Sequence, residues 1–307
     1  MTEQKPDLKA PMTDLPKQEW LEAIAAATED DGSFATLGKR HFAAFIEMGT
    51  TLLVTFETFQ GIHALSPIAQ PFGWEMLHDH GWSHLCLASD GDTWFRDPAV
   101  YAYFDRLIDD GFFDEFDNVI FYGAGPCAYA AAAYSVSAPA SQVVLIQPQA
   151  TLDPRITDWD DRFTDMRRTD FTSRYGYAPD MLEAAQSAYV LYDPRETLDA
   201  MHAALFTRPN VTKFRMPHMG AALQTDLMEM GILGPMLQMA TDNTLDKLAF
   251  ARLYRARRDY RPYLRTLLSA TEEDTRDALT LSLCKYVTTR VHDPRFVRKL
   301  RHLEGDS

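Results

Sequence analysis

One stretch of the sequence decides the fold: Val119-Ile-Phe-Tyr-Gly123-Ala-Gly125-Pro-Cys127-Ala-Tyr-Ala-Ala131. Its first four residues are apolar, as in a buried strand, and the alanines after Cys127 favour a closely packed helix. Two glycines and a proline between these segments predict a sharp turn. The sequence therefore predicts a strand, a turn and a helix in direct succession, with Gly125 at the centre of the turn.

The composition indicates a protein with a large core. The chain has 307 residues, of which 46% are hydrophobic, which is enough for one large domain or a domain with an appendage. It has no apolar run of about 18 residues, and residues 1–17 lack the apolar segment of a secretory signal. Cys86, Cys127 and Cys284 are few and scattered, which favours reduced thiols over disulfides. We therefore expect a soluble, cytoplasmic protein.

The charge is strongly acidic but unevenly distributed. The formal net charge is -14, and residues 242–307 contain 14 Lys and Arg against 10 Asp and Glu, which gives +4. The remainder must then carry about -18, by subtraction. An acidic body disfavours binding to nucleic-acid phosphates. The basic C-terminal part is either a solvated arginine-rich helix face or a contact for an anionic partner.

Apolar runs of strand length recur along the chain, at residues 51–57, 83–89, 118–122, 142–147, 187–192 and 210–216. Short elements are expected before them at 20–27 and 39–47. Helical patterns separate most of the runs; one begins at Asp97-Pro98, where an aspartate cap precedes a first-turn proline, and Gly111 ends it. The alternation predicts an α/β fold, with a mainly parallel sheet covered by helices on both faces.

The strands stop after about residue 232, and four amphipathic helical stripes follow, around residues 245–253, 263–268, 279–287 and 296–303. The expected organisation is a disordered tail over 1–18, a core over 19–232 and a C-terminal helical region over 233–307.

The order of these elements resembles the α/β-hydrolase family over roughly residues 51–230. In that family the nucleophile, the acid and the histidine follow three successive core strands. The resemblance places Gly125, Asp193 and His218 at these positions. It implies that Asp193 orients His218, and that the imidazole accepts a proton from a nucleophile at the turn.

This sequence departs from the family pattern at the turn itself. The family's Gly-x-Ser-x-Gly is replaced by Gly123-Ala-Gly125-Pro-Cys127, so the serine is missing. Pro126 also lacks the backbone N–H that the family uses in its oxyanion hole. The joint loss favours a member without serine-hydrolase chemistry.

Other features, Gly81-Trp-Ser-His-Leu, Phe95-Arg-Asp-Pro and Gln147-Pro-Gln149, resemble a group of alphaproteobacterial proteins with the same altered turn. Some of those proteins carry the name phosphoadenosine phosphosulfate reductase. The Ser-Gly-Gly-Lys-Asp-Ser loop and the C-terminal cysteine motif of that reductase have no counterpart here, so its activity is not carried over.

Each candidate catalytic residue has a structural alternative. Asp193 precedes a proline, as Asp97, Asp153 and Asp293 do, and helix capping explains all four; Glu196 would complete a capping box with Asp193. His218 is either a structural histidine or a residue that polarises water or donates to a ligand. Cys127 is either a small buried side chain or a thiolate activated by a helix N-terminus.

The remaining candidates concern ligands. Gly123 and Gly125, together with Trp94 and Arg96, are expected to line a ligand pocket, although Trp94 and Arg96 could equally anchor loops. His78, His80 and His84 do not have a familiar metal-ligand spacing, and Gly123-Ala-Gly125 lacks the third glycine of a dinucleotide fingerprint. We therefore expect neither a metal nor a cofactor.

The leading hypothesis is a catalytically degenerate α/β-hydrolase-like protein that binds a small carbonyl- or acyl-type ligand, or a protein partner. The alternative is an active hydrolase or acyltransferase that uses Cys127, or a water activated by His218 and Asp193. A third hypothesis is an interaction protein whose basic helices from Thr241 onward bind an acidic partner. Nucleic acid and membrane are not expected partners.

Overall fold

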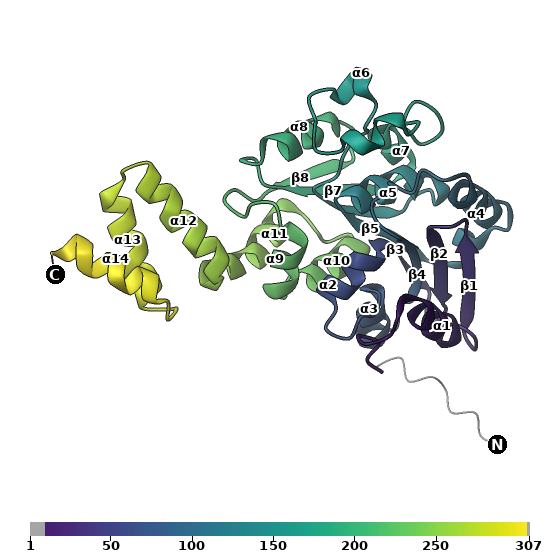
Figure 1. Ribbon diagram of the computed structural model, residues 1–307, viewed down its shortest axis with the longest axis horizontal. Helices are drawn as coiled ribbons and strands as arrows, with labels where there is room; N and C mark the ends of the chain where they lie inside the picture. The colour runs from purple at the N-terminus through teal and green to yellow at the C-terminus, as the bar shows by residue number, and fades with distance from the viewer. Residues whose placement is uncertain (1–9, 306–307) are drawn as a thin grey trace.

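The computed structural model describes residues 10–305, and its centre is one eight-stranded sheet (Figure 1). The strands are β1 (Gly32–Leu37), β2 (His41–Ile46), β3 (Thr51–Thr58), β4 (Ser83–Ser89), β5 (Asn118–Ala124), β6 (Gln142–Ile146), β7 (Ser187–Tyr192) and β8 (Val211–Arg215). All six runs predicted as strands are strands. β1 was not predicted, and β2 was expected only as a short element.

The strand order is β1-β2-β4-β3-β5-β6-β7-β8. Strand β2 is antiparallel to both of its neighbours, and the strands from β4 to β8 pair in parallel. These are the order and directions of the α/β-hydrolase fold, so the predicted fold class is confirmed. The chain leaving β3 returns to β4 on one side, whereas β5 is followed by β6 on the other. The sheet therefore has its topological switch point between β3 and β5, where open α/β sheets bind ligands.

Helices follow or precede most strands. They are α1 (Lys17–Ala27), α2 (Phe59–Leu65), α3 (Gly73–His80), α4 (Pro98–Asp109), α5 (Pro126–Tyr134), α6 (Pro154–Thr157), α7 (Ala178–Met181), α8 (Thr197–Leu205), α9 (Leu223–Glu229), α10 (Leu233–Thr241), α11 (Lys247–Leu253), α12 (Arg261–Glu273), α13 (Asp277–Thr288) and α14 (Pro294–Glu304). Short 3₁₀-helices lie at η1 (Phe112–Glu115), η2 (Ser135–Ser137), η3 (Thr164–Arg168), η4 (Leu182–Ala184) and η5 (Tyr254–Asp259). Among the described residues, no helix combines the length and apolar character that crossing a bilayer requires.

Successive side chains of each strand enter different cores, because strand side chains alternate between the two faces of a sheet. Val54 and Phe121 belong to the core under α4, α5, α7 and α8. Leu53 and Ile120, one residue earlier in each strand, belong to the core under α9, α10 and α11. Helices α1, α2 and α3 pack on a third cluster that includes side chains of β2 and β4. Both faces are therefore covered, which explains the continuous apolar strand sequences.

The predicted cap at the start of α4 is confirmed: the Asp97 carboxylate accepts a hydrogen bond from the Ala99 amide at 2.8 Å. Gly111, with φ +69°, follows the end of that helix. Of the expected N-terminal tail, residues 1–9 lie outside the described residues. Met12 is buried, and its amide donates to the Ile68 carbonyl at 2.9 Å.

The last three helices have a core of their own. Leu264, Leu268, Cys284, Val287 and Phe296 form it. In Figure 1, α12, α13 and α14 extend away from the sheet as an arm, shown in yellow-green to yellow. Helices α10 and α11 do not belong to this arm, because their apolar side chains pack in the core under the sheet.

Candidate functional site

The turn after β5 keeps the backbone geometry of a nucleophile elbow. Gly125 has φ +57° and ψ -125°, a conformation that L side chains rarely adopt. Gly123 is required for close packing, because a Cβ there would lie 2.3 Å from the Cys127 carbonyl oxygen. At Gly125, by contrast, a Cβ would meet no atom within 4 Å. The turn therefore presents open space where the fold normally carries a reactive side chain.

The backbone groups of the turn are already used. The Gly125 amide donates to the Ile146 carbonyl at 2.8 Å, which fixes the turn to the end of β6. The Gly125 carbonyl accepts from the amides of Ala128 and Tyr129 in the first turn of α5. Pro126 supplies no amide. The turn thus offers neither a nucleophile nor a free amide from the residue that follows it.

Asp193 follows β7 and His218 follows β8, so both lie at the same carboxyl edge of the sheet as Gly125. The prediction that Asp193 caps a helix is wrong: α8 begins at Thr197, and its N-cap residue Glu196 makes no side-chain cap hydrogen bond. Asp193 is buried and accepts from the Arg195 amide and the Gly220 amide, each at 2.8 Å. Its carboxylate therefore ties the end of β7 to the loop that carries His218.

His218 has φ +68° and is only partly buried. Burial lowers the pKa of its imidazole, and the nearby Arg195 lowers it further, whereas Asp193 and Asp274 raise it. Among the described residues, its Nδ1 has no hydrogen-bond partner. The imidazole is therefore neutral at neutral pH, in the electrostatic field of Asp193 but without a bond to it.

Cys127 lies in the first turn of α5 with 6% of its surface exposed. Burial, followed by the charges of Glu57 and Asp92, raises the pKa of its thiol well above the usual value. A helix N-terminus lowers a thiol pKa, but here burial outweighs it. The thiol is protonated at neutral pH.

Trp94 and Arg96 hold the segment between β6 and β7 against the body. Trp94 is 1% exposed and packs edge-on against Phe163. Arg96 donates to the carbonyls of Asp170 and Arg174, and its guanidinium lies over the Phe171 ring. Through these contacts, Trp94 and Arg96 anchor residues 163–174.

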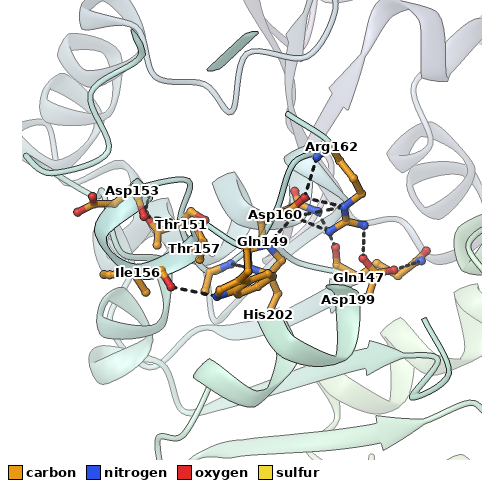
Figure 2. A network of polar contacts seen from close by, with 12 residues as sticks. Gln147, Gln149, Thr151, Asp153, Ile156, Thr157, Asp160, Arg162, Asp199 and His202 are labelled. Carbon is orange, nitrogen blue, oxygen red and sulfur yellow. Dashed lines mark hydrogen bonds and ion pairs between the residues drawn. The ribbon is translucent and has the colours of Figure 1, made fainter. Parts of the chain in front are cut away.

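A polar network at the carboxyl ends of β6 and β7 also holds that segment (Figure 2). The His202 Nε2 donates to Asp160 at 2.9 Å, and both side chains are fully buried. Arg162 forms ion pairs with Asp160 and Asp199, and Asp199 also accepts from Gln147. The Ala150 amide donates to His202 Nδ1, so this imidazole is neutral, and burial lowers its pKa. These side chains therefore fill the space at the carboxyl ends of β6 and β7.

Sequence reasoning missed the polar cluster at the end of β3. Glu57, 9% exposed, accepts from the Thr55 hydroxyl at 2.6 Å and from the Phe72 amide at 3.0 Å. Thr55 in turn lies 2.9 Å from His84 Nε2, and the Cys86 thiol donates to Glu57 at 3.7 Å. Burial raises the pKa of Glu57 and lowers the pKa of His84 to about 3. The signal was available: Glu57 is a charged residue in an otherwise apolar strand run.

Glu57, His84 and Cys86 place three possible metal-ligand atoms within 4.8 Å of one another. The Thr55 hydroxyl bonds both Glu57 Oε1 and His84 Nε2, so it already satisfies two of the three. The Glu57 and His84 atoms that could bind a metal are therefore already engaged in hydrogen bonds with Thr55. His78 and His80 are not part of this cluster; His80 packs beside Trp82.

Glu57 also lines a cavity of about 610 Å³ beside the switch point. Its walls come from α2, α3 and the loop between them, and from α9 and α10. They are mainly apolar, with Ile62, Leu65, Ile68, Phe72, Trp74, Met76, Met228, Leu233 and Pro235 among them. Gly125, Asp193 and His218 are not among its lining residues. Small-ligand sites have this size and character: a concave apolar wall with a few polar groups.

No protein-family model and no curated protein matches the sequence. Among solved structures, Est1E from Butyrivibrio proteoclasticus is 13% identical, with 67% of this chain and 96% of that chain covered and a TM-score of 0.41. The capsule O-acetyltransferase of Neisseria meningitidis serogroup A is 11% identical, with coverages of 64% and 91% and a TM-score of 0.38. MenH from S. aureus is 11% identical, with coverages of 66% and 99% and a TM-score of 0.38. Similarity at this level identifies no activity.

Proposed function

We propose that this protein is a catalytically degenerate α/β-hydrolase-fold protein that binds a small carbonyl- or acyl-type ligand. Three observations at the carboxyl edge of the sheet support the loss of hydrolysis. Gly125 carries no reactive atom, each oxygen of the Asp193 carboxylate accepts a hydrogen bond from a backbone amide, and the Cys127 thiol is buried and protonated. Cysteine chemistry would need a thiolate, which this environment disfavours.

The observation that carries the proposal is a buried carboxyl group in the wall of an apolar cavity. Glu57 lies at the end of β3, next to its final residue Thr58 and beside the switch point, and the cavity that it lines is otherwise mainly hydrophobic. A carboxyl group whose pKa is raised by burial keeps its proton at a higher pH than usual, so it can donate a hydrogen bond.

A carbonyl oxygen is the natural acceptor for that proton. The hydrocarbon part of such a ligand would lie against the apolar walls, where each buried methylene contributes about 0.8 kcal/mol. Gln224, which also lines the cavity, offers an amide as a second polar group. A ligand held in this way needs no nucleophile.

The proposal is tested by binding of neutral methyl ketones and methyl esters of increasing chain length, measured by calorimetry or ligand-observed NMR. We expect affinity to increase with chain length and, for the wild type, to fall as the pH rises and Glu57 loses its proton. Glu57→Gln keeps a donor but cannot ionise, so its affinity should be independent of pH. Glu57→Leu should bind more weakly.

Glu75→Gln is the matched control, because Glu75 lines the same cavity but is exposed. It should retain the affinity and the pH dependence of the wild type. Absence of binding by every ligand of the series, or an identical pH profile for the wild type and Glu57→Gln, would refute the proposal.

A further inference from the structure

A second cavity, of about 650 Å³, is lined by six cationic side chains. It lies at the free edge of the sheet, between β8, α11 and η5. The cationic residues are Lys213, Arg215, Lys247, Arg255, Arg257 and Arg258, and none of the residues that line this cavity is acidic. It shares no lining residue with the cavity of Glu57.

These six cations are unusual because the chain is acidic, with 44 Asp and Glu against 30 Lys and Arg. Within residues 10–305, none of the six forms an ion pair with a carboxylate. Arginines of the neighbouring arm do find such partners: Arg265 pairs with Asp293, and Arg290 with Asp259. Gathering unpaired like charges in one concavity costs electrostatic energy, which an anionic ligand would offset.

Tyr254 forms part of the wall of this cavity. Its side chain lines the cavity and is only 6% exposed, yet among the described residues its hydroxyl has no hydrogen-bond partner. That oxygen is closed off from solvent, and burial raises the pKa of the hydroxyl, with the charges of Asp193 and Asp226 adding to the rise, so the ring and not the hydroxyl faces the cavity. The Arg257 guanidinium lies over the Tyr254 ring at 4.1 Å, which places a cation beside the same hydroxyl-bearing side chain.

We propose that this cavity binds a phosphorylated small molecule carrying at least two phosphate groups. Arginine pairs with phosphate oxygens through its planar, often bidentate donors. Six cations exceed what one phosphate can pair with. The volume is that of a small-ligand site, and the acidic remainder of the chain repels a long polyanion, so nucleic acid is disfavoured.

The test is calorimetric titration of the full chain with inorganic pyrophosphate and tripolyphosphate at about 0.05 M salt, with orthophosphate, citrate and a single-stranded oligonucleotide as comparisons. We expect saturable one-to-one binding, tightest for tripolyphosphate, that weakens at least about tenfold when salt is raised to about 0.5 M.

The variants locate the site. Arg255→Ala and Arg258→Ala should each weaken tripolyphosphate binding by about tenfold or more, because each removes a charge-assisted hydrogen bond. Arg252→Ala is the matched control: Arg252 is exposed on α11 but does not line the cavity, so binding should be unchanged.

Three results would overturn the proposal: no saturable binding of either polyphosphate, equal losses in Arg252→Ala and Arg255→Ala, or binding of the oligonucleotide alone. None of these results bears on the Glu57 cavity, whose ligands are neutral. The two proposals therefore succeed or fail separately.

Discussion

The Asp193 carboxylate accepts a hydrogen bond from the Gly220 amide, with 2.8 Å between Oδ2 and the nitrogen. Its other oxygen accepts from the Arg195 amide at the same distance. The residue that follows β7, where the fold normally carries the catalytic acid, thus holds two backbone segments together. Its role in this geometry is to fix the loop after β8.

Asp193→Asn should destabilise the protein by about 1–3 kcal/mol, because the amide nitrogen would face a backbone N–H that has lost its acceptor. The measurement is the free energy of unfolding in urea. Asp161→Asn is the control, since Asp161 is exposed, and it should change this value by less than about 0.5 kcal/mol. Equal effects of the two substitutions would show that the contact does not hold the loop.

The two glycines of the turn should respond differently to alanine. At Gly123 the added Cβ would lie 2.3 Å from the Cys127 oxygen, so strand β5 and helix α5 would have to separate. At Gly125 the space is open, and the cost is backbone strain of about 1–3 kcal/mol. We expect Gly123→Ala to lose more stability than Gly125→Ala in urea unfolding. The reverse order would contradict the packing described here.

Glu57 predicts a particular pH dependence of stability. Burial raises its pKa in the folded state, so above its usual value near 4.5 the folded protein retains a proton that the unfolded chain releases. Stability due to this group is therefore full at lower pH and is lost as the pH rises, with a slope of at most about 1.4 kcal/mol per pH unit.

Glu57→Gln cannot ionise and should lack this loss. The free energy of unfolding of the variant, minus that of the wild type, should therefore increase between about pH 4.5 and pH 7. Glu75→Gln, which alters an exposed carboxylate, should show no such trend. A constant difference across this range would mean that Glu57 ionises normally.

The arm should unfold on its own when its core is damaged. Phe296 is fully buried in the cluster formed by α12, α13 and α14, and truncating a buried phenylalanine costs about 3–5 kcal/mol. In Phe296→Ala we expect faster amide hydrogen exchange in these helices and unchanged exchange in β5 and α5. Leu279→Ala serves as control, because Leu279 is 51% exposed. Faster exchange throughout the sheet would contradict a separate core.

Local sequence predicted the buried parallel strands and the turn at Gly125, because a continuous apolar run or a glycine turn is encoded by a few consecutive residues. It indicated β2 only as a short element, although this strand is mostly buried, and it did not predict β1, the edge strand, whose residues are mostly exposed or half-buried. An edge strand has little apolar periodicity to detect.

The candidate sites depended on contacts between distant residues. The Asp-Pro pattern led to a capping interpretation at Asp193, whereas the decisive contact is with Gly220, on another loop. Glu57 stood in a strand that was correctly predicted, but the cavity beside it is formed by helices from both halves of the chain. The basic cavity forms only because β8 lies beside α11 and η5. No local sequence pattern encodes these contacts between distant segments.

The most direct test of the proposed loss of hydrolysis is exposure of the purified protein to a fluorophosphonate probe and to p-nitrophenyl esters. Covalent labelling is followed by intact-mass spectrometry and ester cleavage by absorbance, with Cys127→Ser and His218→Ala alongside. We predict no adduct and no cleavage above the buffer rate for all three proteins. An adduct on the wild type, or cleavage that disappears in either variant, would contradict the account.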